Sequence, residues 1–449
     1  MEKTLYGFNA SQDIIHMQTT LTLFKRVGNI VFTTTVDGGF DKALMTKALN
    51  LLFVRHDCLR LTFTKKEGKM VQYFESERSI GEVPFYEFKT QKQFESHLRG
   101  FRKKKNNIQK GETLKVEFCH NACGEEFILY KISHYVADTY AIGVLVTDLF
   151  AIYKALKEGS PLPAEPGKFE DVLRNDLTYK DNTEMVEKDR EFMKDLYTVK
   201  HTKHPEYCGI HGKRSDIWMK EKSKGKFAMK YFFVKCDTVG YRAVIPASVT
   251  TRVINWCGKA GIPIGTYMFY AYAIAASLVN DRQKYQAPLQ LLDCRGTKAE
   301  RSCAGTKVQS ISVYTTVDYD KSFADNVRDL FEEQNQLYRH TKLSYLEVNK
   351  LQLETWGHSQ LSQVINFCYS FIPFRSPEGV HLQVHSNGKG ALPAYIAMML
   401  DVDTNEISVC YDIQSELTTA QLLMDFQNLY VHIIESVLDR PDEALGNIL

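Results

Sequence analysis

Two side chains whose spacing suits catalysis, His134 and Asp138, lie four residues apart in the segment 133–139 (SHYVADT). Free imidazole titrates near pH ~6.5, so a neutral histidine can accept a proton at neutral pH with support from a nearby carboxylate. The pair suits a group-transfer enzyme in which the histidine takes the proton of an attacking amine or hydroxyl. Because the same spacing is frequent by chance, the elements around it have to support this interpretation.

The flanking residues predict that this segment joins a strand to a helix. Residues 127–132 (FILYKI) are typical of a buried strand, and apolar residues recur at helical spacing from Ile142 to Leu156. Loops between such elements often carry reactive side chains, and a carboxylate at a helix start is favoured by capping and by the helix dipole. We therefore expect His134 in a strand-to-helix loop with Asp138 at the start of the helix.

Strand-like and helical segments alternate along the rest of the chain, which indicates an α/β protein with mixed sheets. The expected strands are 30–36, 114–118, 308–317, 395–400 and 407–411. The expected helices are 41–56, 183–196, 249–260, 267–280, 322–338 and 419–438.

A chain of 449 residues is too long for one ordinary core. Gly159 and three following prolines end the helix after His134, and residues 199–226 are polar, basic and without apolar periodicity. We predict an N-terminal lobe at 1–175 that carries the His-x-x-x-Asp motif, a connector and junction at 176–226, and a C-terminal lobe at 227–449.

Composition restricts the partners and the compartment. The 56 basic and 54 acidic residues leave a net charge of +2, which argues against nucleic acid as a partner. Most of the ten cysteines lie in apolar runs, as free thiols do in a reducing compartment. The N-terminal residues form no apolar block of signal-peptide length, and the block 267–279 is too short to span a bilayer. We expect a cytoplasmic protein without a membrane partner.

A second cluster carries ligand types that suit Zn²⁺, namely His201, His204, Cys208 and His211. Its spacing matches no zinc module, and Pro205 and Gly209 suit a plain linker, so we predict no metal site. Three further residues at a predicted hairpin turn are interpreted in the same way: Cys119, His120 and Cys123. The chain contains no glycine-rich phosphate loop and no Gly-x-Ser-x-Gly elbow, so nucleotide-driven chemistry and serine hydrolysis have no support.

The segment around His134 resembles the His-His-x-x-x-Asp-Gly core of the condensation domains of non-ribosomal peptide synthetases. That superfamily also includes chloramphenicol acetyltransferase and the plant acyl-CoA-dependent acyltransferases. Residues 55–60 (RHDCLR) resemble the Arg-His-Glu-x-Leu-Arg helix end of the family. Weaker similarities follow in the family's order at residues 9–12, 108–115, 293–295, 305–313 and 340–345.

The resemblance implies two chloramphenicol-acetyltransferase-like lobes with mixed sheets, arranged in a V around a central tunnel. It implies that His134 is the catalytic base or the group that positions the acceptor, and that Asp138 is structural and pairs with Arg295 of the second lobe. The substrates would be carried on phosphopantetheine, on a peptidyl or acyl carrier protein or on coenzyme A, with no bound cofactor and no metal. The other implied partner is a small-molecule acceptor in natural product biosynthesis.

The chain departs from the family pattern at four positions. Ser133 replaces the first histidine, Thr139 the glycine, Gln309 an asparagine and Tyr314 an arginine. A β-branched residue resists the positive φ that glycine allows, so Thr139 is expected to strain the loop. We expect Ser133, Thr139 and Gln309 to line the tunnel.

Three functions stay open from the sequence. The first is a condensation-type acyltransferase that moves an acyl or aminoacyl group from a phosphopantetheine thioester to an amine or hydroxyl, which forms an amide or an ester. The second is a catalytically silent condensation-like domain that recruits carrier proteins or tailoring enzymes, and the altered residues Ser133 and Thr139 favour it. The third is an acyl-CoA-dependent O-acyltransferase, which differs from the first in that free acyl-CoA alone supports turnover.

Overall fold

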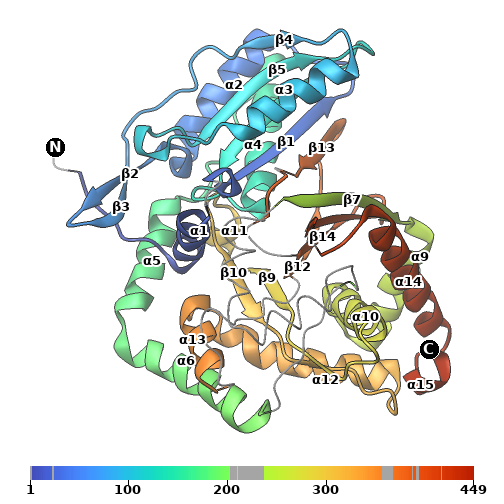
Figure 1. The fold of residues 1–449 in the computed structure, drawn as a ribbon. Helices are drawn as coiled ribbons and strands as arrows, with labels where there is room; N and C mark the ends of the chain where they lie inside the picture. Colours follow the sequence, from blue (N-terminus) through green and yellow to red (C-terminus); the bar gives the residue numbers. More distant parts are fainter. Residues whose placement is uncertain are drawn as a thin grey trace. The chain divides into compact units, whose positions relative to one another are not determined.

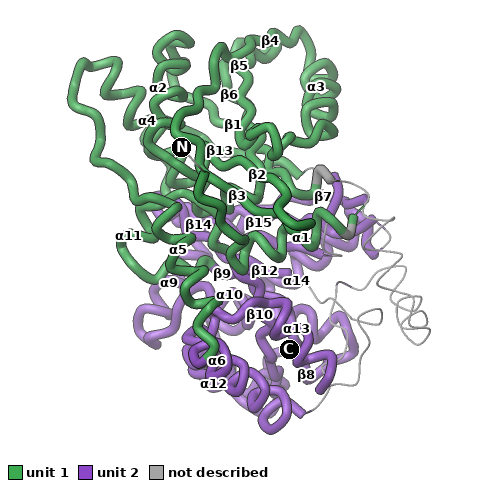
Figure 2. The backbone as a smooth tube through the Cα atoms, turned by 90° about the vertical axis from the view of Figure 1, so that its left-hand side faces the viewer, with its two compact units in different colours: residues 1–183, 293–308, 375–387 green, residues 184–292, 309–374, 388–449 purple. Residues whose placement is uncertain are grey.

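The computed structural model describes residues 3–22, 25–202, 210, 237–355, 368–386, 388–390, 394–415 and 417–449. The chain forms two compact units, each built from parts of the sequence that are far apart (Figure 2). Unit 1 contains residues 1–183, 293–308 and 375–387, and unit 2 contains residues 184–292, 309–374 and 388–449. Each unit combines helices with a sheet, which confirms the predicted α/β class. The V-shaped arrangement around a tunnel stays a prediction.

Unit 1 contains one five-stranded sheet, a two-stranded hairpin and several helices (Figure 1). Its elements are α1 (Ala10–Leu21), η1 (Lys25–Gly28), β1 (Asn29–Val36), α2 (Lys42–Arg55), η2 (Asp57–Arg60), β2 (Leu61–Lys66), β3 (Lys69–Phe74), β4 (Phe85–Glu87), α3 (Gln91–Lys103), η3 (Ile108–Lys110), β5 (Leu114–His120), β6 (Glu126–Ser133), α4 (Thr139–Glu158), α5 (Phe169–Asp181), α11 (Lys298–Arg301) and β13 (Val380–His385).

The central strand β6 explains how the sheet of unit 1 is covered on both faces. The strand order is β13-β1-β6-β5-β4, and alternate residues of β6 point to opposite faces. Ile128, Tyr130 and Ile132 pack in the larger core with residues of α2 and α4. Phe127 and Leu129 pack in a smaller cluster with residues of α3. Figure 1 shows the same layering, with α3 on one side of the sheet and α2 and α4 on the other.

Helix α4 has the start and the end that its sequence predicts. Asp138 caps its first turn by accepting the backbone N–H of Ala141, at 2.8 Å. Gly159 follows its last turn with φ 67°, a left-handed conformation that glycine adopts without a steric penalty. Among the described residues α4 alone is long and apolar enough to cross a membrane, and half of that apolar stretch is buried inside the protein. This burial is what a core helix requires.

Unit 2 is built around a six-stranded mixed sheet with the order β10-β9-β12-β14-β15-β7. Its elements are α6 (Thr183–Asp195), the π-helical η4 (Leu196–Lys200), β7 (Thr238–Ile245), α9 (Ala247–Ala260), α10 (Ile264–Leu278), β8 (Tyr285–Gln286), β9 (Leu289–Asp293), β10 (Val308–Ser312), β11 (Thr315–Thr316), α12 (Phe323–Leu337), η5 (Tyr338–His340), α13 (Tyr345–Thr355), β12 (Cys368–Phe374), β14 (Ala394–Asp401), β15 (Ile407–Gln414), α14 (Ala420–Asp439) and α15 (Leu445–Ile448). Helix α10 is buried all round from Thr266 to Ser277, as its uniformly apolar sequence predicts.

The observed units differ from the predicted lobe boundaries because unit 1 takes two segments from the second half of the chain. Strand β13 pairs antiparallel with the free edge of β1, with Val36 opposite Val380. Residues 293–308 join unit 1 through polar contacts to the loop after β6. The proposed connector is also divided, because α5 belongs to unit 1 and nearly all of α6 to unit 2, while residues 203–209 and 211–226 lie outside the described residues.

The predicted strand 308–317 is wrong in one respect, since it is two strands. Strand β10 ends at Ser312, and β11 pairs with β8 in a separate small sheet. Between them the N–H of Val313 donates to the carbonyl of Pro288, at 3.0 Å. Tyr314 leaves the sheet and stacks on His201 with ring centroids 4.0 Å apart.

Candidate functional site

The loop that carries His134 is held by backbone hydrogen bonds at both of its ends. The Ser133 carbonyl accepts the N–H groups of Val136 at 3.0 Å and Ala137 at 3.3 Å, which forms a tight turn. The Ser133 N–H donates to Thr113 O and the His134 N–H donates to Gly28 O, both at 2.8 Å. The turn therefore lies between the end of β6 and the start of α4, as the sequence predicts.

His134 is a partly exposed residue, and the two nitrogen atoms of its ring differ. Nδ1 is buried and has no hydrogen-bond partner in the described part of the chain, which leaves Nε2 as the nitrogen that can meet a substrate. Burial lowers the pKa of His134 below its ordinary value of 6.5, although the Asp138 charge and the backbone of His134 and Ala137 act in the opposite direction. The ring is therefore neutral at neutral pH, the state in which an imidazole accepts a proton.

Asp138 is buried and uses both carboxylate oxygens. Arg295 Nη2 lies 3.2 Å from Oδ1 and 3.1 Å from Oδ2, while the Lys307 N–H donates to Oδ2 at 2.7 Å. Together with the Ala141 N–H on Oδ1, these contacts satisfy a carboxylate that would be costly to bury alone. The structure thus brings Asp138 and Arg295 together. It places Arg295 in unit 1 with the motif, not in the second lobe as the sequence suggested.

Arg295 has further partners that fix the guanidinium. Its Nη1 donates to Asp293 at 2.5 Å, Nη2 also donates to the carbonyl of Gly305, and the group lies 4.7 Å from the ring centroid of Tyr140. Burial acts against the charge, but the carboxylates of Asp138 and Asp293 outweigh it and raise the pKa of Arg295. Arg295 is therefore a fixed buried cation beside the motif loop.

Helix α1 supports the residue that follows His134, a contact that the sequence did not indicate. The Tyr135 hydroxyl lies 2.9 Å from His16 Nδ1 and 2.7 Å from Thr19 Oγ1. Gln12 Nε2 donates to the Tyr135 carbonyl at 3.0 Å. The buried aromatic side chain at position 135 was the one available signal, since a buried tyrosine hydroxyl usually finds a partner.

The three residues expected to line a tunnel have different surroundings. Ser133 is buried in β6, and Gln309 is buried in β10 of unit 2. Thr139 is partly exposed at the first position of α4 and is not among the residues with positive φ. The strain expected from a β-branched residue at position 139 is therefore absent, because the helix starts there with ordinary geometry. The tunnel-lining roles stay predictions.

Of the suspected zinc cluster, only His201 lies within the described residues. His201 is buried in unit 2, and its Nε2 lies 2.6 Å from Glu333 Oε1. At the hairpin turn, Cys119 is buried in β5, His120 Nδ1 lies 3.5 Å from Glu87 and Cys123 is exposed. Across the described ranges, no group of three or more His, Cys, Asp or Glu side chains is arranged to hold a metal ion.

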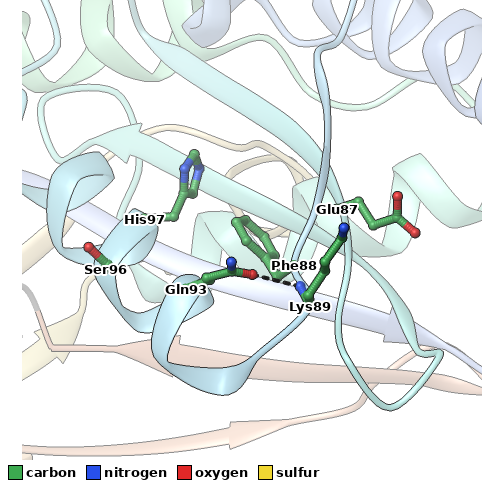
Figure 3. A pocket seen from close by; sticks show the side chains of 6 residues that line it. All are labelled: Glu87, Phe88, Lys89, Gln93, Ser96 and His97. Atoms are coloured by element: carbon green, nitrogen blue, oxygen red, sulfur yellow. Dashed lines mark hydrogen bonds between the residues drawn. The ribbon is translucent and has the colours of Figure 1, made fainter.

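A polar pocket of about 520 Å³ lies elsewhere in unit 1, between β4 and α3 (Figure 3). Six residues line it, namely Glu87, Phe88, Lys89, Gln93, Ser96 and His97. The His97 ring is already engaged, with Nε2 2.6 Å from Glu117 Oε2, and none of the residues of the motif loop lines this pocket.

Comparison with known proteins places the chain in a family. The family model described as the condensation domain matches residues 6–448. One of the plipastatin synthase proteins of Bacillus subtilis is 22% identical over 331 residues, which is 72% of this chain and 12% of that protein. Bacitracin synthase 3 of Bacillus licheniformis is 22% identical over 79% of this chain and 5% of that protein. The chain therefore spans only a small part of the length of these relatives.

Solved structures share the fold at low sequence identity. The first condensation domain of the calcium-dependent antibiotic synthetase, in complex with a substrate analogue, has a TM-score of 0.80 with 14% identity over 99% of both chains. A variant of the starter condensation domain of rhizomide synthetase, in complex with C8-CoA, has a TM-score of 0.78 with 15% identity over 99% of this chain and 98% of that one. Since the family model covers nearly all of the sequence, the chain belongs to the condensation domain family of acyltransferases found in non-ribosomal peptide synthetases.

Proposed function

We propose that the chain transfers an acyl or aminoacyl group from a phosphopantetheine thioester to an amine or hydroxyl acceptor, which forms an amide or an ester. The observation that supports this proposal is a partly exposed His134 on a loop held by a buried Asp138–Arg295 ion pair, with burial that lowers the pKa of His134 and so favours the neutral ring. A base that is fixed in place and unprotonated at neutral pH suits an attacking amine or hydroxyl.

In the proposed step, Nε2 of His134 accepts the proton of the acceptor as the acceptor nitrogen or oxygen attacks the thioester carbonyl. The carbon–sulfur bond then breaks, and the proton passes from the imidazolium to the departing thiolate. Base assistance of this kind contributes typically ~10²–10⁴-fold to the rate. No covalent enzyme intermediate is needed, so Ser133, which is buried, has no nucleophilic role.

The donor is proposed to be a thioester on phosphopantetheine, on a carrier protein or on coenzyme A. The synthetase relatives favour a carrier protein, and the starter condensation domain in complex with C8-CoA favours coenzyme A. Both donors present the same thioester group to His134. The donor must therefore be identified by comparing the same acyl chain on the two carriers.

The test is acyl transfer by the wild-type protein, His134→Gln and Ser133→Ala, followed by intact mass spectrometry. Each protein receives one acyl chain as a carrier-protein thioester and as the coenzyme A thioester, together with amine and alcohol acceptors. We expect His134→Gln to lose ~10²–10⁴-fold in rate, and Ser133→Ala to stay within a few-fold of the wild type. Both variants should melt near the wild-type temperature. If wild type and His134→Gln are equally inert while a carrier protein still binds, the domain is a silent scaffold.

The proposed role of His134 also predicts a pH dependence. Because burial lowers the pKa of this imidazole below 6.5, the ring is neutral above that pH and becomes protonated only below it. With an alcohol acceptor, which does not titrate in this range, the rate should therefore be independent of pH near 7 and should fall as the pH drops through the lowered pKa. The measurement is kcat/KM against pH for the wild type. An acid limb with a midpoint well above pH 6.5 would contradict His134 as the base.

A further inference from the structure

Lys307 is a buried lysine whose ammonium joins two carboxylates of unit 1. Its Nζ lies 2.5 Å from Asp176 Oδ1 of α5 and 3.0 Å from Glu300 Oε1 of α11. The Lys307 side chain is 8% exposed, whereas those of Asp176 and Glu300 are 20% and 17% exposed. A lysine is rarely buried this fully without a partner of opposite charge, so the two carboxylates account for its position.

The backbone of the same residue contacts the motif. The Lys307 N–H donates to Asp138 Oδ2 at 2.7 Å, and the Lys307 carbonyl accepts the N–H of Cys294 at 3.2 Å. The segment 293–308 is thus attached to unit 1 near both of its ends, through Arg295 at one end and Lys307 at the other. The Lys307 side chain binds Asp176 and Glu300, and the backbone N–H of the same residue binds Asp138.

A second set of hydrogen bonds connects one of the carboxylates that bind Lys307 to the loop of His134. Asn9 Nδ2 donates to Asp176 Oδ2 and to Thr306 O, both at 3.2 Å. The Asn9 side chain also caps α1 by accepting the N–H of Gln12, whose Nε2 donates to Tyr135 O. The ammonium of Lys307 therefore lies in one connected polar network with the Tyr135 carbonyl and the Asp138 carboxylate, which follow His134 in the loop.

The positive charge of Lys307 favours the ionised form of the carboxylate of Glu300. Burial opposes ionisation of Glu300, but the backbone N–H of Thr297 and the Lys307 ammonium lower the pKa of Glu300 to about 2. Without the ammonium, Asp176 and Glu300 are two like charges facing one vacated position, and like charges at close range repel each other. Residues 305–308 would then move, and with them the N–H on Asp138.

We propose that Lys307 is a positioning residue for His134, because its ammonium clamps Asp176 and Glu300 and so holds its own N–H on Asp138. This role depends on the proposed function of His134. It differs from plain stabilisation because the structure ties Lys307 to the motif aspartate by a direct hydrogen bond.

The test compares Lys307→Met, Lys307→Arg and the control Lys321→Met. Lys321 pairs with Asp329 at 2.8 Å on the surface of unit 2, so the control removes an ammonium of the same kind from an exposed ion pair. The first measurement is the NMR titration of the labelled histidine side chains, with the His134 signal assigned by its loss in His134→Gln. The second is kcat and KM for acyl transfer, and the third is the melting temperature.

We expect Lys307→Met to change the His134 signal and to shift its titration midpoint, because Asp138, whose charge acts on His134, is no longer held in place by the Lys307 N–H. We expect kcat to fall about ten-fold with little change in KM, as misplacement of a catalytic group predicts. Lys307→Arg should restore both values, and Lys321→Met should leave both unchanged. If Lys307→Met does not fold, the double variant Lys307→Met/Asp176→Asn removes the like-charge repulsion, and the same two changes should then appear.

An unchanged His134 titration in folded Lys307→Met, or in the double variant, overturns the inference whatever the melting temperature. Its failure is distinguishable from failure of the proposed function. If His134→Gln is as active as the wild type, the base role of His134 fails, while the NMR response still reports on the link to Lys307. If His134→Gln is inactive and Lys307→Met matches the wild type in kcat, the function stands and the positioning role is rejected.

Discussion

Two aspartates of α4 each bind an arginine, Asp138 at the N-cap and Asp148 at the middle of the helix. Asp138 caps the first turn and pairs with Arg295, which is 157 residues away in the sequence. Asp148 lies ten residues further along and accepts Arg55 Nε at 2.8 Å and Nη2 at 3.1 Å, with His56 Nε2 at 3.0 Å. Both arginines are almost fully buried.

The partners show what each pair stabilises. Arg55 ends α2, and it also contacts Glu165 and the carbonyl of Ala164, so the Asp148 pair fastens α2, α4 and the segment before α5 together. The Asp138 pair connects the segment 293–308 to the loop that carries His134. Burial of an ion pair thus stabilises packing in the first case and, we propose, both packing and a reactive side chain in the second.

The largest effect is expected for Asp138→Ala, which leaves the buried Arg295 with Asp293 as its remaining carboxylate partner, frees the N–H of Lys307 and removes the cap of α4. Breaking a buried pair costs roughly 3–5 kcal/mol of unfolding free energy, and the loss of an N-cap adds about 1 kcal/mol. We expect stability and acyl transfer to be lost together in thermal melts and transfer assays. A stable Asp138→Ala protein with normal transfer would show that the pair supports neither.

Asp148→Ala should lower the unfolding free energy by a slightly smaller amount, since Arg55 also keeps a carboxylate and a carbonyl as partners but no helix cap is lost. Because this pair makes no contact with the motif loop, the rate per folded molecule should match the wild type. The measurement is urea unfolding together with transfer assays corrected for the folded fraction. A specific loss of rate in the folded protein would contradict the distinction between the Asp138 pair and the Asp148 pair.

Gly305→Ala should have an intermediate effect on stability and on acyl transfer, because it disturbs the contacts of Arg295, the partner of Asp138. Gly305 has φ +133°, and a Cβ placed there would lie 2.1 Å from Phe169 Cδ2. Its carbonyl also accepts Arg295 Nη2. Backbone strain of this kind costs roughly 1–3 kcal/mol, and the displaced carbonyl weakens the hold on Arg295. We expect a lower melting temperature together with reduced transfer, whereas Gly38→Ala, at a glycine with positive φ and open space around it, should reduce stability alone.

The smallest effect is expected for Tyr135→Phe, which removes one hydroxyl and keeps the packed ring. The lost hydrogen bonds to His16 and Thr19 contribute about 1 kcal/mol in total. We expect a slightly lower melting temperature and a rate within a few-fold of the wild type, because Gln12 still holds the Tyr135 carbonyl. A loss as large as that of His134→Gln would assign the hydroxyl a direct part in transfer.

Local signals predicted most of the long elements. Helices expected at 322–338 and 419–438 begin where Ser322 and Thr419 act as N-caps. Helix α3 was not predicted, because it is rich in charged residues and only two of its positions are buried, Leu98 and Phe101. Strand β13 was not predicted either, since a strand of six residues carries no local signal for the strand with which it pairs.

The candidate site divides in the same way. His134, Asp138 and Arg295 were expected from the sequence because the motif and its resemblance named them. Lys307, Tyr135 and the Gly28 carbonyl were not expected, because each acts through a contact with a residue far away in the chain. Hydrogen bonds of this kind leave no periodicity in the sequence.

The sequence by itself determined the order strand, loop and helix from 126 to 158, with the imidazole in the loop and the carboxylate at the cap. Apolar periodicity, the capping aspartate and the terminal glycine act over a few residues, so they can be recognised without the fold. Only the tertiary structure decided that the expected Asp138–Arg295 pair lies within unit 1, that the Lys307 N–H joins it, and that β13 completes the sheet of unit 1. Such pairings depend on which distant segments bury their surfaces together, and that choice is made by the whole packed chain.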